Sequence, residues 1–469
     1  MALIVFGGGF VFMCIFSFFT GLMIKYTMNQ KRDSFSDKFG VIAAAAGSAI
    51  GLGNIWRFPY VLGENGGGAF LLIYLFFIVA IGVPVMLSEL LIGRRAQRSV
   101  FGAFKILAPG LKFFKVVGVM GVSAAFLILS FYAVVAGWTV EYTMLAVGNQ
   151  LVDKTPVELS DMFADFSSSV WRPILYLLVF MAMTAGIVIG GVKNGIEKYT
   201  KVLMPILFVI ILVLCVNALL LDGAVEGLSF LFQPDFSKIN GIVVLEALGQ
   251  AFFSLSIGMG IIATYGSYIQ KKENLLNTAI SVSVADTLIA VLAGVAIFPA
   301  VFAFGIQPDA GPGLVFVTLP NIFNQMFGGY FFAIAFFVLL LIAALTSSVS
   351  LLEVVVAYIT EEIHLSRQKA TLLATVMVTF LGVFCVIYPF LFDSFDYVTS
   401  NFMLPISGIL ISVFVGWIIG KQHTKEELEA HGGSVKIVGV LIVILKIVAP
   451  FAIALVFMKN LGLLDLFIR

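Results

Sequence analysis

The sequence predicts an all-α integral membrane protein, and two observations carry this prediction. Of its 469 residues, 61% are hydrophobic and only 11% are charged, and the mean hydropathy is +1.10. Apolar runs of about 20 residues, enough to cross a hydrocarbon core about 30 Å thick, recur from residue 41 onwards. The formal net charge of +1 excludes a strongly basic nucleic-acid-binding protein. We therefore expect a lipid bilayer, and no nucleic acid, among its partners.

Eleven core membrane spans are expected along the chain. Their approximate limits are 41–63, 69–93, 113–147, 174–191, 202–221, 243–269, 277–304, 331–360, 370–392, 396–420 and 437–458. Lysines and arginines concentrate in the loops on the side of Arg32 and Lys38, so the positive-inside rule places the N-terminus of the core in the cytoplasm. We expect a multi-pass protein of a plasma (inner) membrane.

The first core span contains a glycine-rich interruption, which runs from Gly47 to Asn54. Glycines weaken helical hydrogen bonding, and unpaired backbone groups at bilayer depth are tolerated only where they line a cavity or bind a solute. The interruption is therefore a candidate ion and solute site.

A second interruption, from Gln250 to Gly260, lies in the sixth core span. Broken segments at corresponding places in two halves indicate an inverted repeat with its binding site near the membrane midplane. Spans one to five and six to ten would form the two repeats, because an odd number of helices inverts the second one. The eleventh span lies outside the repeats.

Small and polar residues line one face of the eighth span, at i, i+3, i+4 and i+7: Ala343, Thr346, Ser347 and Ser350. Such a stripe can be a packing face whose hydroxyls bond back to their own helix. Its place beside two broken helices favours oxygen ligands for a small, hard cation. Glu353 continues the stripe, either as a functional acid or as an anchor for loose backbone.

These segments resemble the neurotransmitter:sodium symporter family, the LeuT-type amino-acid transporters. The motifs that carry the resemblance are Ala46–Pro59, Glu64–Phe70, Gln250–Gly260 and Leu345–Ser348. The resemblance implies a LeuT-type 5+5 inverted repeat with unwound first and sixth core helices, and a symporter that imports amino acids by alternating access. No enzyme activity is expected, since all three histidines fall in predicted loops and no nucleophile–base cluster appears in the spans.

The chain is divided accordingly. Residues 28–421 form the expected transport core, with repeats at about 39–221 and 243–420, and residues 422–469 form a cytoplasmic loop and the eleventh core helix. Residues 1–27 are apolar but lack the basic start of a signal peptide. They form either an additional N-terminal helix or a translated stretch upstream of a natural start at Met28. We expect a monomer or a weak dimer.

The resemblance implies two sodium ions. One site would use the carbonyls of Gly47, Ile50 and Ala343 and the hydroxyls of Thr346 and Ser347. The second would use the Ala49 carbonyl with Asn54, Ser254 and Asp286, completed by the carboxylate of the substrate. Ion and substrate would thereby depend on each other for binding.

Asp286 departs from the leucine-transporting type, which has asparagine there, and Ala290 replaces a nearby acid. Chloride-dependent members bind a chloride ion close to this position. A fixed carboxylate would supply that negative charge, so we predict chloride-independent transport. The alternative is a protonated or packing aspartate.

The expected substrate is a neutral hydrophobic or aromatic amino acid. Its carboxylate would meet the amides of Leu52 and Gly53 at a half-helix N-terminus and, by resemblance, the Tyr132 hydroxyl. Its amino group would meet the carbonyls of Ala49, Phe253 and Ser254 and the Ser256 hydroxyl. The side-chain pocket maps to Ser48, Ile128, Tyr132, Phe253, Met259, Ser350 and Leu351, none of which is charged. Met259 replaces an aromatic residue of the leucine type, and its flexible thioether favours larger guests.

Gates are expected on both sides of the site. Arg57 and Asp396 would pair above Phe253 on the outer side, and Arg32 would pair on the inner side with Glu361, where the family has an aspartate. Two alternatives remain. A proton-coupled transporter of the same fold could use Glu89, Asp286 and Glu353, and a non-transporting amino-acid sensor could use the same binding site.

Overall fold

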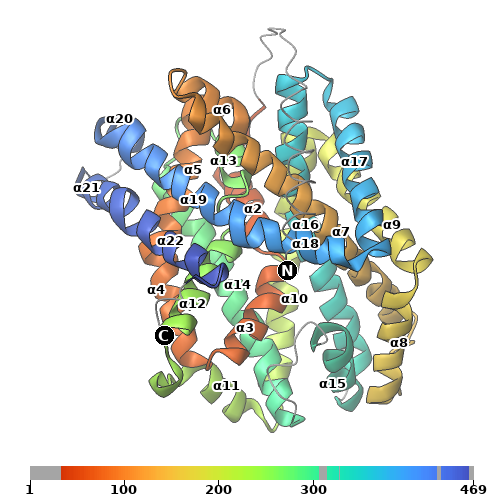
Figure 1. Cartoon of the computed structure of the whole chain (residues 1–469). Helices are drawn as coiled ribbons and strands as arrows, with labels where there is room; N and C mark the ends of the chain where they lie inside the picture. Colours follow the sequence, from red (N-terminus) through yellow and green to blue (C-terminus); the bar gives the residue numbers. More distant parts are fainter. Residues whose placement is uncertain (1–32, 306–313, 327, 430–434, 464–469) are drawn as a thin grey trace.

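The computed structural model describes residues 33–305, 314–326, 328–429 and 435–463, and these residues form helices and connecting loops without a β-strand (Figure 1). Within these ranges, nine helices are long and apolar enough to cross a membrane. A bent pair, Lys38–Ala49 with Gly53–Glu64, passes the same test as one span. The predicted all-α membrane class is confirmed. Arg32 and the extension at 1–27 lie outside the described residues.

The membrane-length helices follow the predicted spans closely. They are α4–η2–α5 (Gly68–Phe77, Ile78–Gly82, Val83–Ala96), η3–α7 (Lys112–Phe114, Lys115–Val147), α9 (Trp171–Ile189), η4–α10 (Val192–Glu197, Lys198–Ala218), α14 (Leu275–Ala303), α16 (Gly329–Glu362), α17 (Arg367–Ile387), α18–η7–α19–η8–α20 (Pro389–Val398, Thr399–Met403, Leu404–Val413, Phe414–Ile419, Gly420–Glu429) and α21–η9–α22 (Val435–Val443, Ile444–Val448, Ala449–Asn460).

Short helices occupy several loops that the sequence analysis left without structure. They are α6 (Val100–Leu107), α8 (Pro156–Ser168), α11 (Ala224–Phe232), η5 (Phe236–Lys238), η6 (Leu314–Thr318) and α15 (Leu319–Gln325). A capping box starts α8, in which Thr155 and Glu158 satisfy each other's backbone amides. The tenth span also continues beyond its predicted end at 420, because α20 adds a polar helical segment.

The first broken helix consists of α2 (Lys38–Ala49), η1 (Gly53–Arg57) and α3 (Phe58–Glu64), and its two halves are bent by 53°. The second consists of α12 (Gly241–Ser254) and α13 (Ile261–Gly266). Ser256, Gly258 and Gly260 between them have φ angles of 53°, 82° and 74°. Such angles end a right-handed helix and are easiest for glycine. The predicted unwinding of the first and sixth core helices is confirmed.

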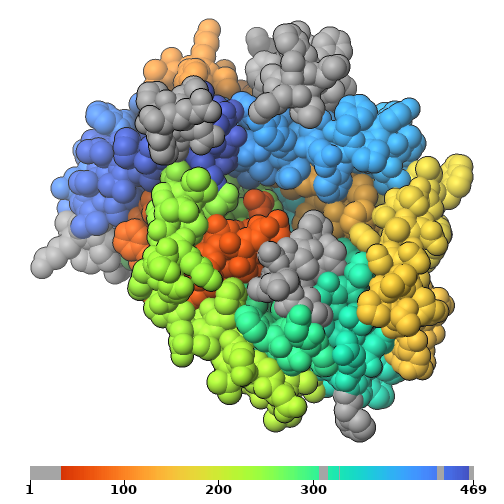
Figure 2. Space-filling model, turned by 60° about the horizontal axis from the view of Figure 1, so that its bottom comes forward, coloured from red at the N-terminus to blue at the C-terminus, as the bar shows by residue number. Residues whose placement is uncertain are grey.

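The broken helices lie in the centre of the helix bundle. Helix α2 packs against α10, α14 and α16, and α13 packs against α5. The α5–α13 contact is close, since a Cβ on Gly93 would lie 1.9 Å from the Ala263 carbonyl oxygen. Figure 2 shows the end of the molecule that carries α3, where the red-orange segment lies beside the green helices. This arrangement buries both helix breaks.

Candidate functional site

A small cavity of about 40 Å³ lies between the two helix breaks. Its lining residues come from the two broken helices with their breaks (α2 to η1 and α12 to α13), from α7 and from α16: Ser48, Ala49, Gly51, Leu52, Gly53, Ile128, Tyr132, Phe253, Ser254, Ser256, Met259, Ile261, Ser347 and Leu351. Every predicted substrate-binding residue except Ser350 is among them. Gly51, Ile261 and Ser347 also line the cavity, although the sequence analysis did not include them in the substrate site.

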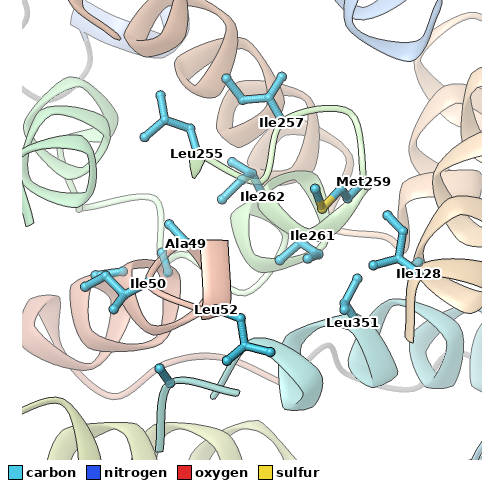
Figure 3. Packing of buried hydrophobic residues seen from close by; sticks show 14 of the residues in the cluster. Ala49, Ile50, Leu52, Ile128, Leu255, Ile257, Met259, Ile261, Ile262 and Leu351 are labelled. Carbon is cyan, nitrogen blue, oxygen red and sulfur yellow. The ribbon is translucent and has the colours of Figure 1, made fainter. Parts of the chain in front are cut away.

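The cavity is apolar on one side. Figure 3 shows Met259 and Ile261 at the second break, with Ile128 and Leu351 approaching from α7 and α16. Ser350 lies elsewhere, because its hydroxyl donates to the Thr346 carbonyl and accepts from the Tyr265 hydroxyl. The lining therefore has no charged side chain, as expected for a neutral guest.

Backbone amides face the polar side of the cavity. The Leu52 amide donates to the Tyr132 hydroxyl at 3.4 Å, which joins the two predicted carboxylate ligands. Gly51 keeps this corner open, since a Cβ there would lie 2.5 Å from the Ser347 hydroxyl oxygen and 3.3 Å from that of Tyr132. A helix N-terminus suits a carboxylate when it offers backbone amides, a nearby hydroxyl and a glycine that leaves room beside them.

The first predicted cation site is built by α16 against the end of α2. The Ser347 hydroxyl lies 3.2 Å from the Ser48 carbonyl oxygen and 3.4 Å from that of Ile50. Thr346 lies 3.1 Å from the Ala343 carbonyl oxygen, and a Cβ on Gly47 would touch Thr346. The structure thus places the Ser347 hydroxyl against the end of α2. The Thr346 hydroxyl bonds back to the Ile342 and Ala343 carbonyls of its own helix, as the packing-face alternative predicts. These uncharged oxygens suit a small, hard cation.

The second predicted site is centred on Asp286, which is fully buried in α14. Its carboxylate oxygens accept from the Asn54 amide and the Ser254 hydroxyl, each at 2.7 Å. Ala49 lines the adjoining cavity. A cation here requires the Asn54 amide to turn its oxygen inward. Both hydrogen-bond donors are neutral, so they do not balance the charge of a buried carboxylate.

Tyr74 and Arg367 were missed by the sequence analysis. Tyr74 donates to the Ser254 hydroxyl at 3.2 Å. Arg367 forms an ion pair with Glu353 at 2.6 Å and donates to the Val188 carbonyl. Neither residue belongs to a local motif, because the partner of each lies on another helix. The only signal in the sequence was a polar side chain within or next to an apolar span.

Glu353 and Glu89 are both held by specific partners. Glu353 also accepts a hydrogen bond from the Tyr268 hydroxyl at 2.6 Å, so it connects α16 and α17 to the end of the second broken helix. Glu89 on α5 accepts from the Gly258 amide at 2.7 Å. The Glu353 carboxylate therefore bonds to the side chains of Tyr268 and Arg367. The contact with loose backbone that was the alternative for Glu353 is made by Glu89 instead.

Two of the predicted gate residues, Arg57 and Phe253, line a second cavity of about 210 Å³ on the α3 side of the site. The Arg57 guanidinium lies 4.2 Å from the centre of the Phe253 ring. Asp396 accepts from the Ser400 hydroxyl at 2.9 Å, and the predicted ion pair between Asp396 and Arg57 is not formed among the described residues. On the opposite side, Glu361 accepts from the Ser99 amide at 2.8 Å. Its expected partner Arg32 is not described.

Two broken helices, with carbonyl and hydroxyl oxygens converging at their breaks, define an inverted-repeat membrane transporter. Among the residues that the structure describes, no cluster of three or more His, Cys, Asp and Glu could hold a metal ion. Hydroxyl and carbonyl oxygens lie at the first break beside the Asp286 carboxylate, and the Glu89 carboxylate lies at the second break.

Comparison with known proteins gives the family. The sequence profile of the Sodium:neurotransmitter symporter family matches residues 32–155 and 153–465, so the chain belongs to this family. It is 38% identical to the uncharacterized sodium-dependent transporter YhdH of Bacillus subtilis, over 93% of this chain and 99% of that protein. An uncharacterized sodium-dependent transporter of Haemophilus influenzae is 37% identical, with the same coverage of both chains.

A solved structure agrees with this assignment. The crystal structure of MhsT in complex with L-phenylalanine has a TM-score of 0.85 and 45% identity, and the match covers 92% of this chain and all of that one. The predicted family and LeuT-type fold are confirmed. The chain is a multi-pass membrane protein that transports a small molecule in a sodium-dependent way, and it is not an enzyme.

Proposed function

We propose that this protein imports neutral hydrophobic and aromatic amino acids, each with two sodium ions and without chloride, by alternating access across a plasma membrane. The observation that carries the proposal is the position of Asp286. Its carboxylate, Asn54 and Ser254 meet beside an apolar cavity whose polar corner suits a carboxylate. A sodium ion between the two carboxylates would attract both and offset one of their two negative charges.

The substrate backbone would bind at the polar corner. Its carboxylate would replace the bond between the Leu52 amide and Tyr132, and the Gly53 amide lies at the same half-helix start. Its amino group would bind the carbonyls of Ala49, Phe253 and Ser254. The Ser256 hydroxyl, which bonds to the Ser48 carbonyl, would be a further ligand.

The substrate side chain would lie among the apolar lining residues. Ile128, Met259 and Leu351 offer no partner for a charged group, which supports a neutral side chain. The L-phenylalanine bound to the similar protein MhsT supports an aromatic guest. The cavity of about 40 Å³ requires Met259 and Phe253 to move for a large ring.

Sodium coupling is supported by the groups at the other site. The Ser347 hydroxyl lies near carbonyls at the end of α2, with Thr346 beside it on α16, whereas a proton-coupled protein would need no hydroxyl ligands there. Of the acids that a proton-coupled mechanism could use, Glu353 is paired with Arg367. The outer gate would close when Arg57 bridges to Asp396 over Phe253, and Glu361 with Arg32 would close the inner side.

The test is uptake of labelled leucine, phenylalanine, tyrosine and tryptophan into proteoliposomes. With a tenfold inward sodium gradient and 100 mV, the limit for one coupled sodium ion is about 500-fold accumulation. We expect concentrative uptake of these amino acids with sodium alone, and none with a proton or potassium gradient. Sodium-dependent binding without accumulation would identify a sensor, and proton-driven uptake would overturn the proposed coupling.

A further inference from the structure

The eleventh span has no role in the proposed transport cycle, yet one of its charged residues pairs with an acid that lines the cavity beside Arg57. Lys459, near the end of α22, forms an ion pair with Glu246 on α12. Helix α22 packs against both α12 and α19, and Ile453, Val456 and Asn460 line the same cavity as Glu246 and Arg57. The eleventh span is therefore a wall of the cavity that leads to the site.

Two acids lie in this region near Arg57: Glu246 lines the same cavity, and Asp396 bonds to Ser400, which also lines it. They lie on different parts of the molecule. Glu246 is on α12, which contacts η1 and α3, so it belongs with Arg57 to the pair of broken helices. Asp396 is on α18, in the tenth span. An ion pair between Arg57 and Asp396 would connect the broken helices to the tenth span. An ion pair between Arg57 and Glu246 would stay within the broken helices.

We propose that Lys459 is a positioning residue of the outer gate, because its ion pair with Glu246 keeps that carboxylate from capturing Arg57. The Lys459 side chain is 17% exposed and that of Glu246 is 42% exposed, so the pair is accessible and can exchange. With Lys459 in place, Arg57 stays over Phe253 and available to Asp396. Without it, Arg57 turns to Glu246 and the gate stays open. This inference rests on the gate described under the proposed function.

A cysteine at Asn401, which lines the cavity, reports whether the gate is open. Cys215 and Cys385 are buried, so Asn401→Cys in a Cys14→Ser protein is the reporter. Its alkylation by a membrane-impermeant maleimide is measured in sodium, with and without leucine. Exposed ion pairs contribute about 0 to 1 kcal/mol, which corresponds to a rate change of up to about fivefold.

We expect Lys459→Gln to raise the alkylation rate about threefold, a change within the range for an exposed pair. Glu246→Gln alone should leave the rate close to that of the reporter, since Arg57 then has no competing acid. The double variant should match Glu246→Gln, which a simple loss of packing at Lys459 would not produce. Lys446→Gln is the control on the same span, because its ammonium lies 4.9 Å from the Trp417 ring and outside the cavity lining.

The outcomes separate this inference from the proposed function. If leucine with sodium fails to slow alkylation of the reporter itself, the proposed gate is wrong. If leucine does slow it but Lys459→Gln has the reporter's rate, or the double variant stays as fast as Lys459→Gln, only the role of Lys459 is overturned.

Discussion

The two proposed sodium sites share the break in the first helix but differ in charge. At one site, the neutral Ser347 hydroxyl lies near carbonyls at the end of α2, and the Thr346 hydroxyl bonds to carbonyls of its own helix. At the other, the carboxylate of Asp286 is fully buried between neutral donors. A buried charge without a positive partner is costly, whereas buried hydroxyls satisfied by carbonyls are not. The first site can therefore persist without an ion, and the second depends on one.

The largest expected effect on sodium dependence follows from removing the negative charge of Asp286. Asp286→Asn keeps the shape of the side chain but removes the carboxylate, and charge-assisted interactions contribute about 1.5 to 3 kcal/mol. We expect the sodium concentration for half-maximal uptake to rise about 10- to 100-fold, as estimated from that range. Added chloride should partly restore uptake.

The matched control for this change is Asp393→Asn, since Asp393 is an exposed aspartate on α18. It should leave sodium dependence unchanged. An Asp286→Asn protein with normal sodium affinity and no response to chloride would remove the distinction between the two sites.

Of the two proposed sodium sites, only the one that contains Asp286 should lose a ligand when the substrate lacks its carboxylate. Leucinamide keeps the apolar side chain but cannot complete the ion shell beside Asp286. We expect it to inhibit leucine uptake about 20-fold more weakly than leucine, which corresponds to about 1.8 kcal/mol. Equal inhibition by the two compounds would show that the substrate carboxylate is not a ligand of this site.

Changes at the neutral site should be smaller. Thr346→Ala and Ser347→Ala each remove one of several oxygen ligands, and a neutral hydrogen-bonding group contributes about 1 kcal/mol. Sodium affinity for uptake should fall about fivefold in each variant, without any gain of chloride dependence. Ser348→Ala is the control on the same turn, because the Ser348 hydroxyl is buried without a partner among the described residues. If Ser348→Ala weakens sodium dependence equally, the assignment of ligands on α16 is wrong.

The helix breaks could be predicted from the sequence because their cause is local. Glycines and polar residues inside apolar spans end a helix wherever they lie, and the structure places both breaks where Gly47–Asn54 and Gln250–Gly260 predicted them. The stripe on the eighth span was also local, since its period fixes one helix face. Ser350 shows the limit of this argument, because it shares the stripe but bonds to Thr346 and Tyr265.

The contacts between distant helices could not be predicted in this way. The ion pairs Glu353–Arg367 and Glu246–Lys459 join residues on different helices, and no spacing in the sequence relates them. Amphipathic loop helices such as α8 and α11 are too short to give the apolar signal of a membrane span. Family resemblance supplied the ligand sets, and only coordinates could test which side chains meet.

The smallest expected effect is that of chloride on the unmodified protein. Because Asp286 supplies a fixed negative charge, replacing chloride by gluconate should change leucine uptake by less than about twofold, a free-energy difference below about 0.4 kcal/mol. A strong loss of uptake would mean that an anion, and not Asp286, balances the ion at the charged site.

The central claim is that the substrate carboxylate completes one sodium site and not the other. Equilibrium binding of radioactive sodium to the purified protein, with and without saturating leucine, tests it most directly. We expect leucine to raise the amount bound by one sodium ion per protein and Asp286→Asn to abolish that increase. The same amount of bound sodium with and without leucine would contradict the account.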